Sequence, residues 1–238
     1  VRWILNTLTP IKSNVLPTIH LDIKHKNYLK LIEKLEDVVR GEGRPKDRGL
    51  LNRKSVIVPG FIRYQGQAYK VKIRHKGLSY DHRNTGKMSL RFSVKDGKSL
   101  FGMREFAIQH PVVRYFLMEW GYLDHLRTEG VLAPRYGHIN VVLNGTQKGI
   151  FALEEHFSKE LLESQGRREG VILRFNSNLG EHSVTWRLSP LIFGHFSTAE
   201  VGGFKSKRIL KDEALKLQYQ IAHQLLEDFL SGKKKTSE

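Results

Sequence analysis

The sequence contains no cysteine, so it can form neither a disulfide nor a metal site built from thiolates. It also lacks any apolar run close to the ~18 residues that a membrane-spanning helix needs. No HExxH zinc motif, GxSxG nucleophile turn or complete GxxxxGK[ST] phosphate loop is present. The eleven histidines stand at no paired ligand spacing, so we expect no metal site among them.

Acidic residues are scarce relative to basic ones. The chain has 40 Lys and Arg against 24 Asp and Glu, which gives a net charge of +16. A surplus of this size favours an anionic partner, such as nucleic acid, a membrane surface or a phosphorylated ligand. The cations are dispersed along the chain, however, and dispersed cations are also typical of an ordinary solvated surface.

The length and composition indicate a globular protein. With 238 residues, 39% hydrophobic residues and twelve Phe, the chain can build a sizeable core as one large or two small domains. It begins at Val1 and not at Met, and it ends in the polar tail SGKKKTSE. We therefore expect it to be a piece of a longer protein.

The hydrophobic pattern predicts a mixture of strands and helices. Alternation predicts strands at 16–23, 55–63, 67–75, 87–94, 138–143, 149–154 and 170–176. Helical spacing predicts helices at 26–40, 111–128, 157–165 and 211–231, and Pro111 suits the first position of the second one. Residues 100–111 are interpreted as a crossover. From residue 55 onwards this order resembles that of a protein-kinase small lobe.

The stretch RHKGLSYDHRNTGKMSLRF at 74–92 has the pattern of a phosphate-binding loop. Two basic, strand-like arms flank a polar loop that contains Gly77 and Gly86. Four cations surround it: Arg74, Lys76, Arg83 and Lys87. Such a loop can offer backbone N–H groups and positive charge to a phosphate. A plain basic surface hairpin is the alternative interpretation.

Lys87 and Glu119 form a candidate ion pair. At ~100° per residue, Glu119 falls on the apolar face of the predicted helix 111–128, where a carboxylate needs a cationic partner. In a kinase small lobe, a strand lysine binds nucleotide phosphates and a helix glutamate orients that lysine. The alternative is that Glu119 pairs locally with Arg114 or Arg127.

Four ordered segments resemble the CotH (spore coat protein H) kinase-like family, and most closely its bacterial envelope branch. They are RHKGLSYDH followed by GKMSLRF, LFGMREFAIQHPVVR, EGVLAPRYGHINVVLNGTQKGIFALEEHFSKELLE, and RREGVILRF. The resemblance extends over about residues 16–176. It implies an α+β fold, the N-terminal lobe of an atypical protein kinase, in which a helix packs on a twisted antiparallel sheet and the C-terminal catalytic lobe is largely missing.

The resemblance also implies a division of the chain and a set of site residues. The expected parts are a strand and helix extension at 1–50, a kinase-like small lobe at 51–156, and a hinge with the start of a truncated large lobe at 157–238. The nucleotide-phosphate residues would be Arg74, Lys76, Gly77, Ser79 and Lys87, with Glu119 orienting Lys87 and with Glu154 and Glu155 at the hinge.

By the same resemblance, the intact protein would bind ATP with Mg²⁺ or Mn²⁺ and phosphorylate Ser or Thr of an unknown protein. It would lie at the extracytoplasmic face of the bacterial envelope, with a membrane anchor upstream of Val1; the cytoplasm is the alternative location. After residue 170 the only aspartates are Asp212 and Asp228, and neither stands in a kinase motif. We therefore expect no phosphotransfer by this chain alone. Whether the intact protein transfers phosphate or only binds ATP stays open.

A second function class competes with this interpretation. The chain would then be a non-catalytic basic module that binds nucleic acid or an anionic envelope polymer. A single-strand binder interleaves exposed aromatic residues with cations on strands, whereas here most aromatic residues fall in the predicted helix 111–128. We therefore expect no nucleic acid partner, but the net charge keeps the anionic polymer as the alternative.

Overall fold

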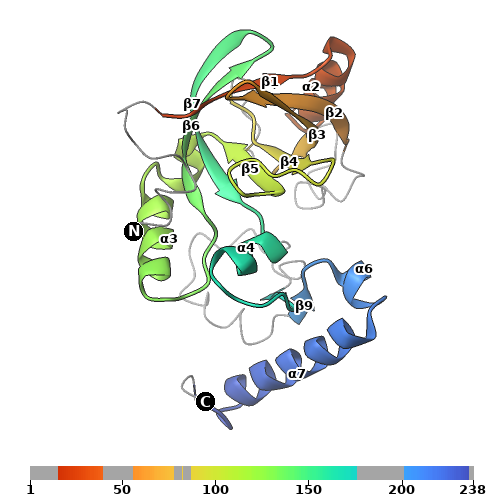
Figure 1. Ribbon diagram of the computed structural model, residues 1–238, viewed down its shortest axis with the longest axis vertical. Helices are drawn as coiled ribbons and strands as arrows, with labels where there is room; N and C mark the ends of the chain where they lie inside the picture. Colours follow the sequence, from red (N-terminus) through yellow and green to blue (C-terminus); the bar gives the residue numbers. More distant parts are fainter. Residues whose placement is uncertain (1–15, 40–55, 78–81, 83–86, 176–200, 236–238) are drawn as a thin grey trace. The chain divides into compact units, whose positions relative to one another are not determined.

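Seven strands close into a barrel in the order β1-β2-β3-β4-β5-β7-β6 in the computed structural model (Figure 1). The structure describes residues 16–39, 56–77, 82, 87–175 and 201–235. The strands are β1 (Thr18–Asp22), β2 (Val58–Tyr64), β3 (Gln67–His75), β4 (Leu90–Val94), β5 (Glu105–Gln109), β6 (Tyr136–Leu143) and β7 (Thr146–Glu155). Neighbouring strands are antiparallel except β1 and β6, which run parallel and close the barrel.

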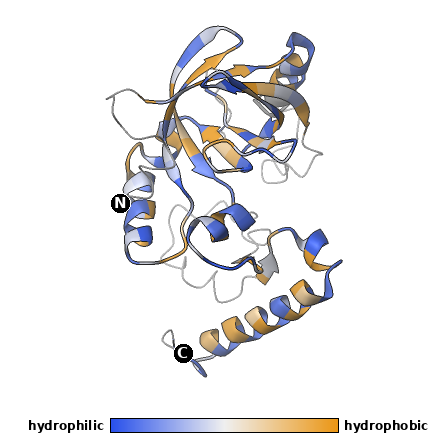
Figure 2. Ribbon diagram, viewed as in Figure 1, coloured by the Kyte–Doolittle hydropathy of each residue, from blue (hydrophilic) through white to orange (hydrophobic). Residues whose placement is uncertain are grey.

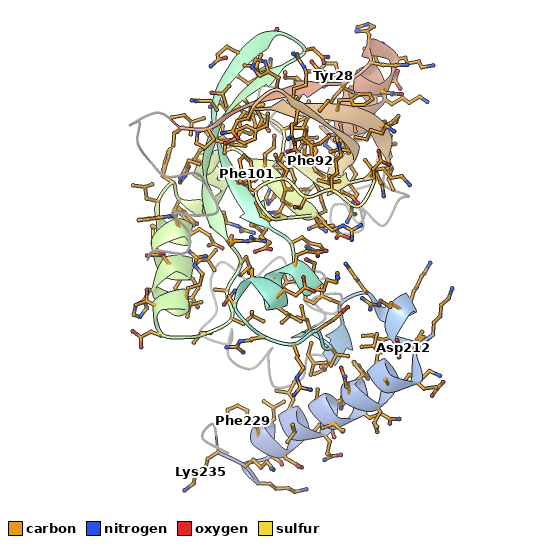
Figure 3. All side chains as sticks on the ribbon, viewed as in Figure 1. Tyr28, Phe92, Phe101, Asp212, Phe229 and Lys235 are labelled. Carbon is orange, nitrogen blue, oxygen red and sulfur yellow. The ribbon has the colours of Figure 1, made fainter. Side chains whose placement is uncertain are left out.

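The barrel interior is filled by the alternate residues of every strand. Phe92 of β4 and Phe106 of β5 are fully buried there, and their rings stack with centroids 5.2 Å apart. Phe101 contributes to the same core, and Figure 3 shows it and Phe92 within the barrel. Since side chains alternate between the two faces of a strand, the residues between the core positions point outward.

The turn between β6 and β7 has the geometry that its sequence predicts. Asn144 and Gly145 both have positive φ, 48° and 82°, as a two-residue Asn-Gly hairpin requires. Asn144 Oδ1 also accepts a hydrogen bond of 2.7 Å from the backbone N of Ile23, just beyond β1. The turn therefore helps to hold β1 against the β6–β7 hairpin.

The expectation of a kinase-like small lobe, with a helix packed on a twisted antiparallel sheet, is wrong. The predicted strands at 55–63, 67–75, 87–94, 138–143 and 149–154 are present, but they belong to a closed mixed barrel with few helices. The sheet closes because β1 pairs with both β2 and β6, and because β5 joins β4 to β7.

The interpretation of residues 100–111 as a crossover is wrong for a physical reason. This segment contains β5, and Phe106, Ala107, Ile108 and Gln109 are all buried. A strand that is covered on both faces shows no alternation of polar and apolar residues, so the usual signal for a strand is missing.

The predicted helix 111–128 is present in two pieces. A 3₁₀ turn, η3 (Pro111–Arg114), begins at Pro111 as expected, with His110 Nδ1 accepting from Val112 N at 3.1 Å. Tyr115 and Phe116 then adopt left-handed conformations before α3 (Met118–Thr128) begins. α3 packs against β6. The break changes the direction of every side chain that the continuous helix was used to place.

Unit 1 (residues 1–165) also contains α2 (His25–Val39) and α4 (Lys159–Ser164), and unit 2 (166–238) contains β8 (Leu173–Phe175), β9 (Val201–Gly203), α6 (Ser206–Ile209) and α7 (Glu213–Leu230). Of these remaining elements, α2, α4, β8 and α7 were predicted from the sequence, whereas β9 and α6 lie in a segment, 180–208, that was expected to be irregular. Hydrophobic and hydrophilic residues alternate along α7 (Figure 2). The Asp212 side chain caps α7 by accepting from the backbone N of Ala214 and Leu215. Among the described helices, none is both long and apolar enough to cross a membrane.

Candidate anion-binding site

A row of side chains crosses five strands on the outer face of the barrel. The register pairs Arg74 with Arg91, Arg91 with Ala107, Ala107 with Glu154, and Glu154 with Tyr136. Directly paired residues project from the same face of a sheet. This face is the outer one, because the positions on either side of Arg91 in β4 are buried in the barrel core.

Lys76, two residues beyond Arg74, is the centre of this region. Its side chain is only 8% exposed, and Nζ donates to Glu154 Oε2 and, at 3.1 Å, to Gln109 Oε1. Gln109 Nε2 donates to the same Glu154 oxygen at 2.9 Å. Burial lowers the pKa of Lys76, the Glu154 carboxylate opposes this effect, and the charges of Arg114 and Arg91 lower the pKa further.

Hydrogen bonds that involve Ser89 and His82 fix the backbone of Lys76. Lys76 N donates to Ser89 O and Ser89 N donates to His82 O, both at 2.9 Å, while His82 Nδ1 lies 2.9 Å from Ser89 Oγ. Gly77 has a φ of +83°, and a Cβ at this position would lie 2.1 Å from His82 Cδ2. Glycine is therefore required both by the backbone conformation and by the close packing of His82.

Two guanidinium groups approach Lys76 from different elements. Arg91 of β4 is partly buried; burial lowers its pKa, and the charge of its neighbour Arg74 lowers it further. Arg114, at the end of η3, acts electrostatically on both Lys76 and Tyr136. Neither Arg91 nor Arg114 forms a salt bridge to any carboxylate of the described residues.

Tyr136, the first residue of β6, is only 2% exposed and packs with Leu123 of α3. Burial raises the pKa of Tyr136 to about 12; the Gln109 side chain opposes the rise, and the charges of Glu154 and Glu119 add to it. The hydroxyl therefore stays protonated at any physiological pH. We refer to Arg74, Lys76, Arg91, Gln109, Arg114, Tyr136 and Glu154 as the outer-face cluster.

Lys87 and Glu119 lie apart from this arrangement and from each other. Lys87 Nζ donates to Ile150 O at 3.2 Å and sits 5.6 Å from the centroid of the Phe151 ring. Among the described residues no ion pair joins Lys87 to Glu119. Glu119 is half-buried on α3, and its charge acts on Tyr136.

Glu154 and Glu155 face opposite sides of β7. Glu154 points into the outer-face cluster, whereas Glu155 is fully buried at the end of the barrel. Arg135 binds Glu155 through both ends of its guanidinium, with Nη2 at 2.5 Å from Oε1 and Nε at 2.9 Å from Oε2. Arg135 Nη2 also donates to Gly102 O at 3.0 Å. This pair joins β6 and β7 to the loop before β5.

Two of the residues that the sequence assigned to a phosphate site, Arg74 and Lys76, belong to the outer-face cluster. Glu154, which the sequence assigned to the hinge, belongs to the same cluster. Ser79 lies outside the described residues. Sequence reasoning missed Arg91, Gln109 and Tyr136 as site residues. Their positions depend on the register of β5, which the pattern did not reveal.

The residues present do not provide a metal site. Within the described ranges, no group of three or more His, Asp or Glu side chains is placed to hold a metal ion. The Mg²⁺ or Mn²⁺ that the CotH resemblance implies therefore has no set of ligands in this part of the chain, and no chemical step is derived through it.

Comparison with known proteins adds no assignment: no family model and no curated protein matches this chain.

Proposed function

We propose that this chain is the phosphate-binding part of an ATP-dependent, CotH-like protein kinase, with Lys76 as the lysine that contacts the nucleotide phosphates. The observation that supports this proposal is the buried ion pair between Lys76 and Glu154. In this role Glu154, and not Glu119, is the carboxylate that orients the lysine.

The electrostatics of the cluster favour a phosphate ligand. Four cations, Arg74, Lys76, Arg91 and Arg114, belong to the cluster, against the carboxylate of Glu154 within it and those of Glu105 and Glu119 nearby. A partly buried group of cations with incomplete compensation attracts anions, because its charges are poorly screened by solvent. Guanidinium and ammonium groups are also the usual protein partners of phosphate oxygens.

The geometry makes Lys76 a better candidate than Lys87. The Lys76 ammonium is held by two side chains, Glu154 and Gln109, so little of its conformational freedom remains to be lost when a ligand binds. The contacts of Lys87 are a backbone carbonyl, that of Ile150, and the ring of Phe151. In the intact protein, the reaction would be the transfer of phosphate from ATP to Ser or Thr, as the resemblance implies.

The test is ATP binding, measured by isothermal titration calorimetry at fixed ionic strength. We expect Lys76→Met to weaken binding at least about tenfold, because a charge-assisted contact to phosphate is lost. Lys87→Met and Lys98→Met each remove the same single charge outside the cluster, so we expect them to bind ATP as the unaltered chain does. Thermal unfolding of each variant checks that the barrel is intact.

Two results would count against the proposal. Equal ATP affinity of Lys76→Met and the unaltered chain would remove Lys76 from the phosphate site, and an effect of Lys87→Met alone would restore the assignment made from the sequence. Salt-sensitive binding of single-stranded DNA or long-chain polyphosphate, with no measurable ATP binding, would support the basic module for an anionic polymer.

A further inference from the structure

Three buried polar atoms in the outer-face cluster lack a hydrogen-bond partner. They are Arg91 Nε, Arg114 Nε and Tyr136 Oη, which lies beside the Gln109 amide but makes no hydrogen bond of normal geometry with it. They make up three of the five such side-chain atoms among the described residues. Buried polar groups in folded proteins are almost always paired, so unpaired groups concentrated in one place call for an explanation. A bound ligand that supplies the missing partners is one such explanation.

The three atoms come from separate elements of the outer-face cluster: β4, η3 and β6. Arg91 and Tyr136 lie in the same row of paired residues across the sheet, with the small side chain of Ala107 and then Glu154 between them. Arg114, at the end of η3, lies close enough for its charge to act on both Lys76 and Tyr136.

All three unpaired groups are able to donate, and the Glu154 carboxylate in the same row already serves other donors. Glu154 Oε2 accepts from both Lys76 and Gln109. A ligand that satisfies Arg91, Arg114 and Tyr136 together must therefore bring several acceptor oxygens. We infer that Arg91, Arg114 and Tyr136 form a binding site for a phosphate dianion, either free inorganic phosphate or the terminal phosphoryl group of a nucleotide.

Phosphate fits this site better than a carboxylate does. A carboxylate has two oxygens in one plane, whereas the donors here arrive from β4, β6 and η3. A tetrahedral phosphate offers oxygens in several directions, and the planar fork of arginine matches its edges. Tyr136 supplies a neutral donor, because its hydroxyl does not ionise near neutral pH. The carboxylates of Glu105 and Glu119 lie at the rim, where they act on Arg91 and Tyr136 respectively.

This inference rests on the proposed function for the identity of the nucleotide, but not for the phosphate site itself. Lys76 and Glu154 carry the proposed function, whereas Arg91, Arg114 and Tyr136 carry the inference. The two can therefore be tested with different probes on the same variants.

The experiment titrates the full chain with inorganic phosphate at pH 8, where the dianion dominates, and in parallel with ATP in the absence of metal. We expect saturable binding of phosphate. Tyr136→Phe should weaken it about tenfold, because it removes one hydroxyl donor and changes no charge. Arg91→Gln should weaken it by about tenfold or more, because it removes a guanidinium group that can donate to phosphate.

Two matched variants serve as controls. Tyr122→Phe removes a hydroxyl from an exposed position on α3. Arg63→Gln removes one positive charge from an exposed position on β2. Both should bind phosphate as the unaltered chain does. Circular dichroism and thermal unfolding confirm that each variant is folded before its affinity is compared.

The outcomes separate the two proposals. If ATP binds and depends on Lys76, but phosphate binding is absent or unaffected by Tyr136→Phe and Arg91→Gln, the phosphate site is overturned and the proposed function stands. If phosphate binds with the expected dependence while ATP neither binds nor competes, the site stands and the nucleotide function fails. Equal weakening by Arg63→Gln would reduce the site to a general effect of charge and overturn it.

Discussion

At the scale of single residues, the buried hydroxyl of Tyr136 is the observation that most directly supports the phosphate site. This hydroxyl lies under α3 without a hydrogen bond of acceptable geometry to a described residue, and leaving such a group unpaired costs about 1–3 kcal/mol. The protein retains that cost although a phenylalanine would fill the same space. A role for the hydroxyl in ligand binding explains why.

The raised pKa of Tyr136 predicts a loss of stability at alkaline pH. Its pKa is about 12 in the folded chain against 10.0 for an unperturbed tyrosine, so the folded state keeps the proton when the unfolded state has lost it. The contribution of Tyr136 to the free energy of unfolding is fully present below pH 10 and is lost as the pH rises towards 12. Through Tyr136 alone, the free energy of unfolding should be about 1 kcal/mol lower at pH 11 than at pH 9.

Urea unfolding at pH 9 and pH 11 measures this effect by comparing the unaltered chain with Tyr136→Phe. The free energy of unfolding should fall more steeply with pH in the unaltered chain, because lysines and other tyrosines contribute equally to both proteins. Identical falls would mean that Tyr136 ionises normally and is not held as a neutral donor.

At the scale of single residues, the sequence predicts part of the outer-face cluster. Arg74 and Lys76 stand out because they begin a cationic loop with a glycine, and both belong to the outer-face cluster. Lys87 has the same local pattern but contacts the backbone of Ile150. Nothing in the local sequence distinguishes the two lysines, since Glu154, the partner of Lys76, lies 78 residues further along the chain.

At the scale of elements, the Arg135–Glu155 pair joins three segments of the barrel end. Both side chains are buried, at 7% and 0% exposure, and Arg135 additionally donates to the carbonyls of Phe101 and Gly102. With these bonds, both charged groups have partners for most of their hydrogen-bonding atoms. Removing one partner would leave the other charge buried without compensation.

We therefore expect Glu155→Gln to destabilise the chain by about 3 kcal/mol, because it leaves the Arg135 charge uncompensated. Glu163→Gln is the matched control: Glu163 forms an exposed pair with Lys159 on α4, and such pairs contribute about 0.5 kcal/mol or less. Chemical denaturation at pH 7 measures both. A cost for Glu155→Gln that is no larger than for the control would show that the pair is not essential to the barrel end.

Elements with one exposed face were predicted best. β2, β3, β4, β6 and β7 alternate clearly, and α2 and α7 show helical spacing, so the sequence locates all of them. β5 was missed because both of its faces are covered. The break at Tyr115 and Phe116 was missed because neither residue is one that usually adopts a left-handed conformation.

At the scale of the whole barrel, β1 changes the architecture. The sequence gives β1 a clear strand pattern, but nothing local tells whether this strand belongs to a separate extension or to the main sheet. Its pairing with β6 spans more than a hundred residues, from Thr18 to Asn140. Long-range parallel pairing of this kind leaves no mark in local periodicity, so closure of the barrel could not be predicted from the sequence.

Closure of the barrel by β1 predicts opposite effects at two adjacent residues. Ile19 is fully buried in the barrel core, whereas His20, the next residue of the same strand, is exposed. Ile19→Ala should lower the free energy of unfolding by about 3 kcal/mol, since it leaves a cavity among the residues of several strands. His20→Ala should change it by about 0.5 kcal/mol or less. Urea denaturation followed by circular dichroism gives both values. If Ile19→Ala cost as little as His20→Ala, β1 would be an appendage and the barrel would be open between β2 and β6; a loss confined to Ile19→Ala requires β1 to be an integral strand of the barrel.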